Sequence, residues 1–277
     1  MILAGLEAAA ELDALDPCAA MTWTAWQRSL LADASSFRLA LTANQLGKTV
    51  SAAADVVMEV RGSNPYRPRR HAGPITVVML GESISQMSAA DGPLEKLWKL
   101  LPKHEIDPKI VFERGTGIRG VKEPVIRFVR GPGAGSVIQL RTYNQPARSK
   151  AGSTVHMVWA DEPMPEKTYG ELAPRLLRNQ GLFLYTLTPV PDMYDQTWAR
   201  EKAETGVFSV HHVTMKPEHT QPEGFARPLI SQAMIDQFRE QLPEVERAMR
   251  LEASWDPVVT GRWLTNFDER TVQSFSV

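Results

Sequence analysis

The pattern of apolar and polar positions is most regular between Phe37 and Val60. Residues 37–42 are apolar and β-prone apart from Arg38, which predicts a buried strand. Residues 50–60 repeat small apolar side chains at helical spacing, namely Val50, Ala53, Val57 and Val60. The chain therefore passes from a buried strand into a helix through residues 42–49, TANQLGKT.

The remaining pattern predicts alternating strands and helices. Apolar runs predict strands at residues 75–80, 125–129, 136–143, 155–161, 181–187 and 208–215. Helical spacing predicts helices at residues 1–20, 83–101 and 198–204, a packing helix carrying Trp23, Trp26, Leu30 and Leu31, and two amphipathic helices that meet near Leu242-Pro243. Residues 61–74 are rich in Pro, Gly and Arg, which predicts an exposed basic loop. The sequence GPGAG, residues 131–135, predicts a hairpin turn.

Residues 42–49 keep most of the phosphate-binding pattern G-x-x-x-x-G-K-[ST]. Gly47, Lys48 and Thr49 match it, whereas Thr42 replaces the first glycine. In such a loop the backbone N–H groups face phosphates, the lysine reaches the terminal phosphates, and the hydroxyl ligates Mg²⁺. A chance Gly-Lys-Thr before a helix is the alternative explanation.

A second motif ends the strand that follows Val155. Asp161 and Glu162 come directly after an apolar run, so we expect two carboxylates at the carboxyl edge of a sheet. In a nucleotide hydrolase the first carboxylate holds the Mg²⁺ shell and the second orients or deprotonates the attacking water. A strand that simply ends in solvent is the alternative for this motif alone. A third strand ends at Thr188-Pro189, where the hydroxyl could sense the nucleotide or the acidic pair.

Composition limits the classes of partner. The 277 residues carry a net charge of -1, which gives no support for nucleic acid as a bulk partner, so any such site must be a local patch. Residues 109–150 nevertheless hold nine Lys/Arg against Glu113 and Glu123, which indicates either a nearby anionic partner or an ordinary basic surface. The single Cys18 fits a reducing cytoplasm. We expect neither a signal peptide nor a membrane span, and no zinc site at His211, His212 and His219, because adjacent residues of a strand point to opposite faces.

Four segments together resemble the ATPase half of the large terminase subunit of tailed bacteriophages, the motor that drives DNA into a procapsid. These are Trp23–Gln27, the N-Q-x-G-K-T loop at Asn44–Thr49, the strand ending in Asp-Glu-Pro at Val158–Pro163, and Thr188-Pro189. The likeness extends to residues 242–255 and 261–267, and it rests on the order and spacing of the segments.

The resemblance implies a fold and a division of the chain. We expect an α/β P-loop NTPase of the RecA/ASCE-like type, with a mostly parallel sheet flanked by helices and a small C-terminal helical lid subdomain. Residues 1–210 would form the ATPase core with its N-terminal helices. Residues 211–277 would form a lid and linker leading toward an absent nuclease domain, so we expect no DNA cleavage from this polypeptide.

The resemblance also implies roles for individual residues. Gln27 would contact the adenine edge, Lys48 the β- and γ-phosphates, and Glu162 the hydrolytic water. Thr49 and Asp161 would hold Mg²⁺, and Thr188 would couple hydrolysis to movement. Arg148, or less favourably Arg141, would stabilise charge on the transferring phosphoryl group, although a surface role or a DNA contact explains either arginine equally well. The nucleotide-binding loop comprises Thr42, Ala43, Asn44, Gln45, Leu46, Gly47, Lys48 and Thr49; it departs from many terminases in Thr42 and in the lack of a basic residue among positions 43–46.

The expected function is Mg²⁺-dependent ATP hydrolysis that drives double-stranded DNA into a procapsid in the host cell cytoplasm. The expected partners are DNA, the portal protein and procapsid, the small terminase subunit and further copies in a ring, with a monomer in isolation. A helicase-like ATPase is one alternative, but the residues after Val190 are too few for a second RecA-like lobe. A nucleotide-binding scaffold without turnover is another, and the intact Lys48, Thr49, Asp161 and Glu162 argue against it.

Overall fold

A seven-stranded sheet forms the centre of the molecule. The structure, a computed structural model, describes residues 16–145, 154–189 and 194–256. The strand order is β5-β6-β2-β7-β8-β1-β9, and every neighbouring pair is parallel except β5 and β6. The strands are β1 (Phe37–Thr42), β2 (Thr76–Gly81), β5 (Val125–Arg127), β6 (Val137–Thr142), β7 (Met157–Asp161), β8 (Leu182–Leu187) and β9 (Ser209–Val213). A separate hairpin pairs β3 (Val111–Glu113) with β4 (Gly117–Arg119). The predicted mostly parallel α/β sheet is confirmed.

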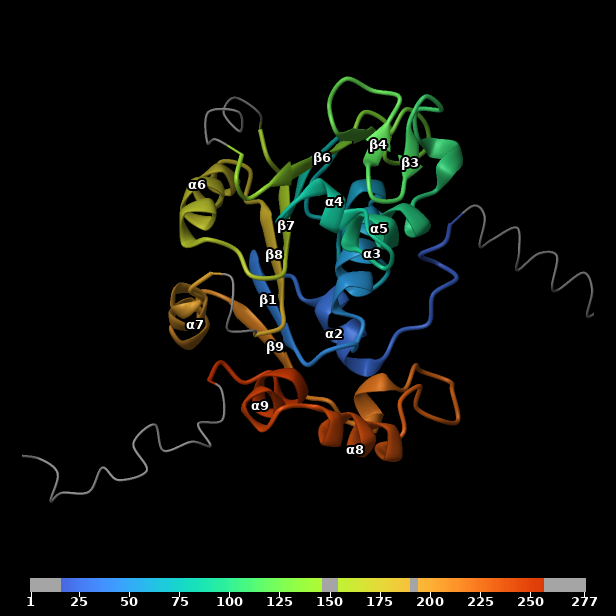
Figure 1. Ribbon diagram of the computed structural model, residues 1–277. Coiled ribbons are helices and arrows are strands. Elements are labelled where there is room, and N and C mark those ends of the chain that lie inside the picture. The colour runs from blue at the N-terminus through green and yellow to red at the C-terminus, as the bar shows by residue number, and fades with distance from the viewer. Residues whose placement is uncertain (1–15, 146–153, 190–193, 257–277) are drawn as a thin grey trace, which may run out of the picture.

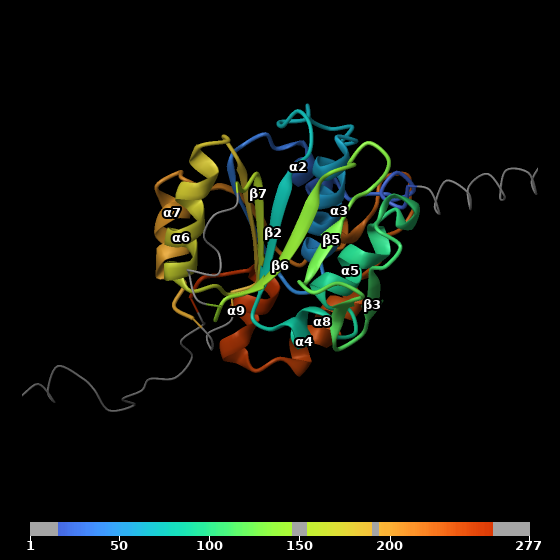
Figure 2. The same ribbon diagram turned by 90° about the horizontal axis from the view of Figure 1, so that it is seen from above.

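Helices cover both faces of this sheet (Figures 1 and 2). One face packs against α2 (Ala25–Ala32), α3 (Lys48–Arg61), α4 (Ile84–Met87) and α5 (Pro93–Leu100), and the other against α6 (Glu166–Leu177) and α7 (Thr197–Glu204). Side chains along each strand alternate between the two cores, as Ala40 and its neighbours Leu39 and Leu41 do. Within the described ranges, no helix has the length and apolar character needed to cross a membrane.

The C-terminal helices lie at the edge of the sheet where β1 ends (Figure 1). After the short 3₁₀ turn η3 (Pro217–Thr220) come α8 (Gln232–Gln241) and α9 (Glu244–Glu252), with Pro243 capping α9, so the predicted pair of helices is confirmed. The N–H of Met215 donates to the carbonyl of Leu251 at 2.6 Å, which ties α9 to the segment after β9. The sheet continues to Val213, beyond the expected boundary at residue 210, and the division into core and lid stays a prediction.

Two predicted helices differ from the structure. The helix expected over residues 83–101 is wrong: α4 ends at Met87 and α5 begins at Pro93, with the left-handed Asp91 (φ 58°) between them. A proline suits the first turn of a helix but not its interior, so Pro93 starts a new helix. The helix expected around Trp23 begins at Ala25, because the Thr24 side chain caps it. The helix expected over residues 1–20 falls mainly outside the described residues.

The loop after α3 is less exposed than its composition suggests. Arg69 and Arg70 are exposed as expected, but Arg67 and His71 are buried. Arg67 contacts the carboxylates of Asp55 at 2.6 Å and Glu59 at 3.1 Å. A short 3₁₀ turn, η1 (Lys103–Glu105), lies beyond α5.

The same cluster explains the charged residue in the first predicted strand. Arg38 is fully buried, and its guanidinium contacts the other carboxylate oxygen of Asp55 at 2.7 Å. Asp55, itself fully buried, therefore joins β1, α3 and the loop that carries Arg67. Burying these charges is tolerable because each guanidinium has a carboxylate partner.

Replacing Asp55 is expected to unfold the protein much more easily. Asp55→Ala leaves the guanidiniums of Arg38 and Arg67 without their shared partner, which costs about 3–5 kcal/mol of unfolding free energy. Urea unfolding followed by circular dichroism measures the loss. Glu223→Ala is the control, because its ion pair with Arg28 is solvent-exposed and is worth less than about 1 kcal/mol. Equal losses in the two variants would contradict a structural role for the buried cluster.

Candidate nucleotide-binding site

The ends of three neighbouring strands converge at one edge of the sheet. β1, β8 and β7 are adjacent and parallel, with Leu41 opposite Leu187 and Thr186 opposite Asp161. The residues that follow each strand therefore emerge side by side. In this way the structure brings together five predicted site residues: Lys48, Thr49, Asp161, Glu162 and Thr188.

The loop after β1 has the backbone conformation of a phosphate cradle. Gly47 is left-handed (φ 86°) and precedes the first residue of α3, Lys48. A Cβ at Gly47 would lie 2.6 Å from the Gln27 amide nitrogen, so a larger residue would strain this backbone and displace the end of the Gln27 side chain. The first N–H groups of a helix have no intrahelical acceptor, so the start of α3 offers donors to an anion.

Gln27, on α2, contacts this loop at Gly47. Its side-chain oxygen accepts a hydrogen bond from the Thr24 N–H at 2.9 Å, and its amide nitrogen lies 3.5 Å from the Gly47 carbonyl. The side chain is only 9% exposed. In this structure Gln27 therefore holds the loop against α2, and its predicted contact with the adenine edge stays a prediction.

The first half of the loop is fixed by the protein itself. Thr42, Ala43 and Leu46 are buried. The N–H of Ala43 donates to the Val213 carbonyl at 2.8 Å, and the N–H of Asn44 donates to the Arg250 carbonyl of α9 at 3.0 Å. These two amides are thus engaged with β9 and α9, so the donors available to phosphate begin at Gln45, an exposed left-handed residue (φ 59°).

Lys48 is held by an acidic residue and a hydroxyl. Its ammonium lies 2.7 Å from Glu162 Oε1 and donates to Thr188 Oγ1 at 2.8 Å. The Lys48 side chain is 11% exposed and that of Glu162 is 41% exposed. In this arrangement Glu162 neutralises the cation that is expected to bind the terminal phosphates.

Asp161 and Thr49 offer the oxygen ligands that Mg²⁺ prefers. Thr49 Oγ1 lies 3.4 Å from Asp161 Oδ1, and the hydroxyl of Thr186 donates to the same oxygen at 2.5 Å. Burial and the adjacent Glu162 raise the pKa of Asp161 to about 6, although Lys48 and the Thr186 hydroxyl act in the opposite direction. A buried carboxylate with a raised pKa fits a position that a cation would stabilise. Sequence reasoning missed Thr186; the available signal was a hydroxyl within an apolar strand.

Glu162 stands on a strained backbone. Its φ of 64° is left-handed, which costs a non-glycine residue on the order of 1–2 kcal/mol. Its N–H donates to the Thr186 carbonyl at 2.8 Å. The hydroxyl of Tyr143 donates to the carbonyl of Asp161 at 2.7 Å and lies 3.2 Å from that of Glu162. Burial and the nearby Tyr185 and carboxylates raise the pKa of Tyr143 well above its ordinary value, so this phenol keeps its proton. Sequence analysis placed Tyr143 only at the end of a strand.

Two hollows border the site. A cavity of about 60 Å³ lies beside Glu162 and is lined by Gly81, Gln86 and Tyr143, among others. Most of its lining is apolar, but its size and the polar side chains of Gln86 and Tyr143 suit ordered water. A more open groove of about 290 Å³ flanks Gln45, with the apolar side chains of Met215, Met234 and Phe238 along its wall.

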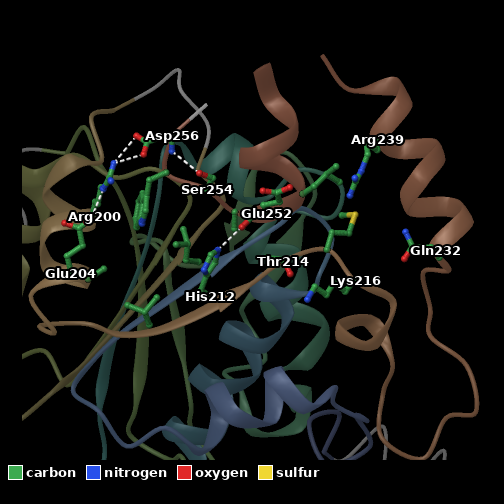
Figure 3. A pocket seen from close by; sticks show the side chains of 17 residues that line it. Arg200, Glu204, His212, Thr214, Lys216, Gln232, Arg239, Glu252, Ser254 and Asp256 are labelled. Carbon is green, nitrogen blue, oxygen red and sulfur yellow. Dashed lines mark hydrogen bonds and ion pairs between the residues drawn. The ribbon is translucent and has the colours of Figure 1, made fainter. Parts of the chain in front are cut away.

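A third groove lies away from these residues, between α7 and the C-terminal helices (Figure 3). It encloses about 880 Å³ along β9. Arg200 contacts Glu204 and Asp256 at one end, and Arg239 and Gln232 line the α8 side. His212 bonds to the carbonyl of Glu252 at 2.8 Å. Of the predicted site residues that the structure describes, none lines this groove.

The two candidate arginines keep their role only as a prediction. Arg148 lies outside the described residues. Arg141 lies on β6, where its guanidinium donates to the Gln139 side chain at 3.2 Å. Stabilisation of the transferring phosphoryl group by either arginine therefore stays a prediction.

Comparisons with known proteins agree with the fold. The model of the family described as terminase large subunit, T4likevirus-type, N-terminal, matches residues 39–270. A search of curated proteins found no match.

Solved structures give the same result. The large terminase of a thermophilic bacteriophage is 11% identical, with a TM-score of 0.63 over 85% of this chain and 54% of that one. The same terminase in complex with ADP is 13% identical, with a TM-score of 0.61 over 84% of this chain and 54% of that one. The large terminase ATPase domain of the Thermus phage P74-26 is 14% identical, with a TM-score of 0.56 over 88% of this chain and 96% of that one. The chain thus spans about half the length of the first of these terminases.

The Lys48–Glu162 ion pair generates a prediction about nucleotide affinity. Glu162→Gln removes the negative charge that competes with phosphate for Lys48, so ADP is expected to bind several-fold more tightly. Titration of a fluorescent ADP derivative measures the dissociation constant. Glu82→Gln is the control. Glu82 lines the same cavity as Glu162, so this variant removes a nearby negative charge but keeps the ion pair between Lys48 and Glu162. Unchanged or weaker ADP binding in Glu162→Gln would show that the pair does not oppose the nucleotide.

Proposed function

The chain belongs to the family of N-terminal domains of T4-like terminase large subunits, and on that premise we propose that it is the ATPase of a viral DNA-packaging motor. It couples Mg²⁺-dependent ATP hydrolysis to the translocation of double-stranded DNA into a procapsid. The observation that carries the proposal is the convergence of Lys48, Thr49, Asp161 and Glu162 at one edge of the sheet. These side chains supply a cation, two metal ligands and a carboxylate for water, which phosphoryl transfer to water requires.

Each group has a place in the reaction. Lys48 leaves Glu162 and binds the β- and γ-phosphates, while the N–H groups at the start of α3 donate to the phosphate oxygens. Thr49 and Asp161 would hold Mg²⁺, which would neutralise charge on the phosphates. Glu162, freed from Lys48, orients or deprotonates the attacking water. Thr188 contacts both Lys48 and Glu162, which supports a role in coupling the separation of that pair to movement.

The groove beside Gln45 is the position we propose for the base. It adjoins the phosphate loop, and Met215, Met234 and Phe238 offer apolar surface to a purine. Gln27 holds the opposite side of the loop and remains a second candidate for an adenine contact. The ADP complex of the thermophilic phage terminase supports an adenine nucleotide as ligand for this fold.

A basic region on one end of the sheet is the proposed DNA contact. Two of its arginines are paired, Arg114 with Glu95 and Arg119 with Glu113. Lys109, Lys122 and Arg130 are exposed, and they lie on the segments around the β3–β4 hairpin and the edge strand β5. Exposed cations of this kind bind the phosphate backbone without reading the base sequence.

The wider assembly is part of the same proposal. Portal protein, procapsid and small terminase subunit are the proposed partners, with several copies forming a ring on the portal in the host cytoplasm. An arginine, for which Arg148 is the candidate, would complete the charge stabilisation from within the subunit or from a neighbour. The absence of DNA cleavage stays a prediction. A helicase-like ATPase remains one alternative, and a scaffold without turnover, the other, is separated from the packaging motor by the turnover experiment below.

Turnover tests the catalytic assignment. Glu162→Gln is expected to lower steady-state ATP hydrolysis at least ~100-fold, because positioning the water acts mainly in the transition state. Lys48→Ala is expected to weaken ADP binding itself, since it removes the cation at the phosphates. A phosphate-release assay with and without Mg²⁺, DNA and portal-bearing procapsids measures hydrolysis, and titration with fluorescent ADP measures binding. Parent-level hydrolysis in Glu162→Gln would exclude the carboxylate from the mechanism, and nucleotide binding without any hydrolysis by the parent would favour the scaffold.

Salt dependence tests the DNA surface. The double variant Lys122→Ala, Arg130→Ala is expected to bind double-stranded DNA more weakly, with the slope of log affinity against log salt reduced by about one per lost phosphate contact. The matched control is Lys167→Ala, Arg178→Ala, which removes two exposed cations from the α6 side of the sheet. An equal effect of the control pair would contradict a defined DNA surface at the hairpin end.

A further inference from the structure

The turn after β7 is held by two buried tyrosines that come from different strands. Tyr143, which follows β6, donates to the carbonyl of Asp161 at 2.7 Å. Tyr185, within β8, accepts from the N–H of Met164 at 3.0 Å and donates to Gln196 at 2.5 Å. Residues 161–164 therefore leave the sheet between two hydroxyl groups, and Glu162 lies between the two anchored positions.

Only one of these hydroxyls bears directly on the backbone of Glu162. The Tyr143 oxygen lies within reach of two successive carbonyls, at 2.7 Å from Asp161 and 3.2 Å from Glu162. The carbonyls of Asp161 and Glu162 belong to the two peptide groups on either side of the Glu162 Cα. Because both carbonyls face the same hydroxyl, the orientation of one peptide group relative to the other is fixed, and with it the left-handed φ of 64° at Glu162. A non-glycine residue keeps such a conformation only where its surroundings fix it.

Tyr143 is itself firmly placed. Its N–H donates to the carbonyl of Gly81 at 3.0 Å, and its side chain is 5% exposed. Its ring also meets the ring of Tyr194 edge-on, with centroids 6.2 Å apart. Tyr143 thus connects the end of β2 with the segments that follow β6, β7 and β8.

We propose that Tyr143 is a positioning residue for ATP hydrolysis, whose hydroxyl holds the Asp161–Glu162 backbone so that the Glu162 carboxylate faces the phosphates. The inference rests on the proposed function, because it assigns Tyr143 a part in the same reaction. Tyr143 does not touch the nucleotide; it acts through Glu162. Removing the hydroxyl releases the carbonyls, and the carboxylate no longer occupies one position relative to the water.

Tyr143→Phe in the full chain is the test, because it keeps the buried ring and removes only the donor. The expected result is a fall in kcat of about tenfold, since small displacements of a catalytic group are costly, with KM for ATP and the affinity for fluorescent ADP within about twofold of the parent. Tyr169→Phe is the matched control, since Tyr169 is a buried tyrosine that packs on Phe37, Phe183 and Trp198 on the α6 side. It should leave kcat, KM and ADP affinity unchanged.

A double variant separates positioning from general damage. Tyr143→Phe added to Glu162→Gln should lower kcat by no more than about twofold further, because a residue that acts through Glu162 has nothing left to position. A second tenfold loss, a parent-level kcat in Tyr143→Phe, or a loss of ADP affinity matching the loss of kcat would each overturn the proposal.

The backbone can also be examined without turnover. A crystal structure of Tyr143→Phe is expected to show the Glu162 peptide rotated away from its left-handed conformation, and an unchanged Asp161–Glu162 backbone would overturn the proposal. Failure of the proposed function is distinguishable, because a parent protein that hydrolyses no ATP refutes the ATPase assignment while the crystal structure still decides whether Tyr143 holds Glu162.

Discussion

The parallel pairing of β1, β8 and β7 is the constraint on which the site depends. Neighbouring strands lie about 4.8 Å apart, so groups that follow three adjacent strands emerge within about 10 Å of one another. The register fixes which side chains meet: Thr186 stands opposite Asp161 and bonds to its carboxylate. A slip of one residue would send these side chains to opposite faces of the sheet. The apolar cores on both faces resist that slip, because it would also turn Leu39 and Leu41 to the wrong side. Packing far from the nucleotide thereby sets the geometry of the site.

The molecule contains two kinds of buried charge, and their energetics differ. In the cluster of Asp55, Glu59 and Arg67 every carboxylate faces a cation, and hydrogen bonds and charges from His71 and Arg67 lower the pKa of Glu59 despite its burial. At the site, burial and Glu162 instead raise the pKa of Asp161. In the first arrangement the carboxylates of Asp55 and Glu59 balance the charges of Arg38 and Arg67 within the folded chain. In the second, Lys48 is paired with Glu162 and the charge of Asp161 is left for a further cation, which is a physical reason to assign one cluster to stability and the other to ligand binding.

Much of the fold could be predicted because the central strands are continuous apolar runs bounded by glycine, proline or charge. The phosphate loop and the acidic pair were recognisable for the same reason, since each interrupts such a run with residues of distinct chemistry. Interactions that depend on register or on distant segments were not predictable. Arg67 gave no sign of its partner Asp55, and Tyr143 gave no sign that its hydroxyl would reach a neighbouring turn. The break at residues 88–92 was missed because apolar spacing continues across it, although Asp91, Gly92 and Pro93 together are a turn signal that marked the new helix.

The sides of the site differ in how accessible they are to a further binding group. On the α2 side, Gln27 fills the space against Gly47. On the side of β9 and α9, backbone carbonyls accept hydrogen bonds from the amides of Ala43 and Asn44. Lys48 and Thr188 are buried, whereas the Glu162 side chain is 41% exposed. A group that approaches this edge of the sheet from solvent therefore meets Glu162 first. The same side carries Tyr143, which is hydrogen-bonded to the acidic turn and connects it to the segments after β6 and β8. In the proposed function, the carboxylate that orients the water is thus the most exposed of the five site residues, which links the chemical step to whatever contacts that side.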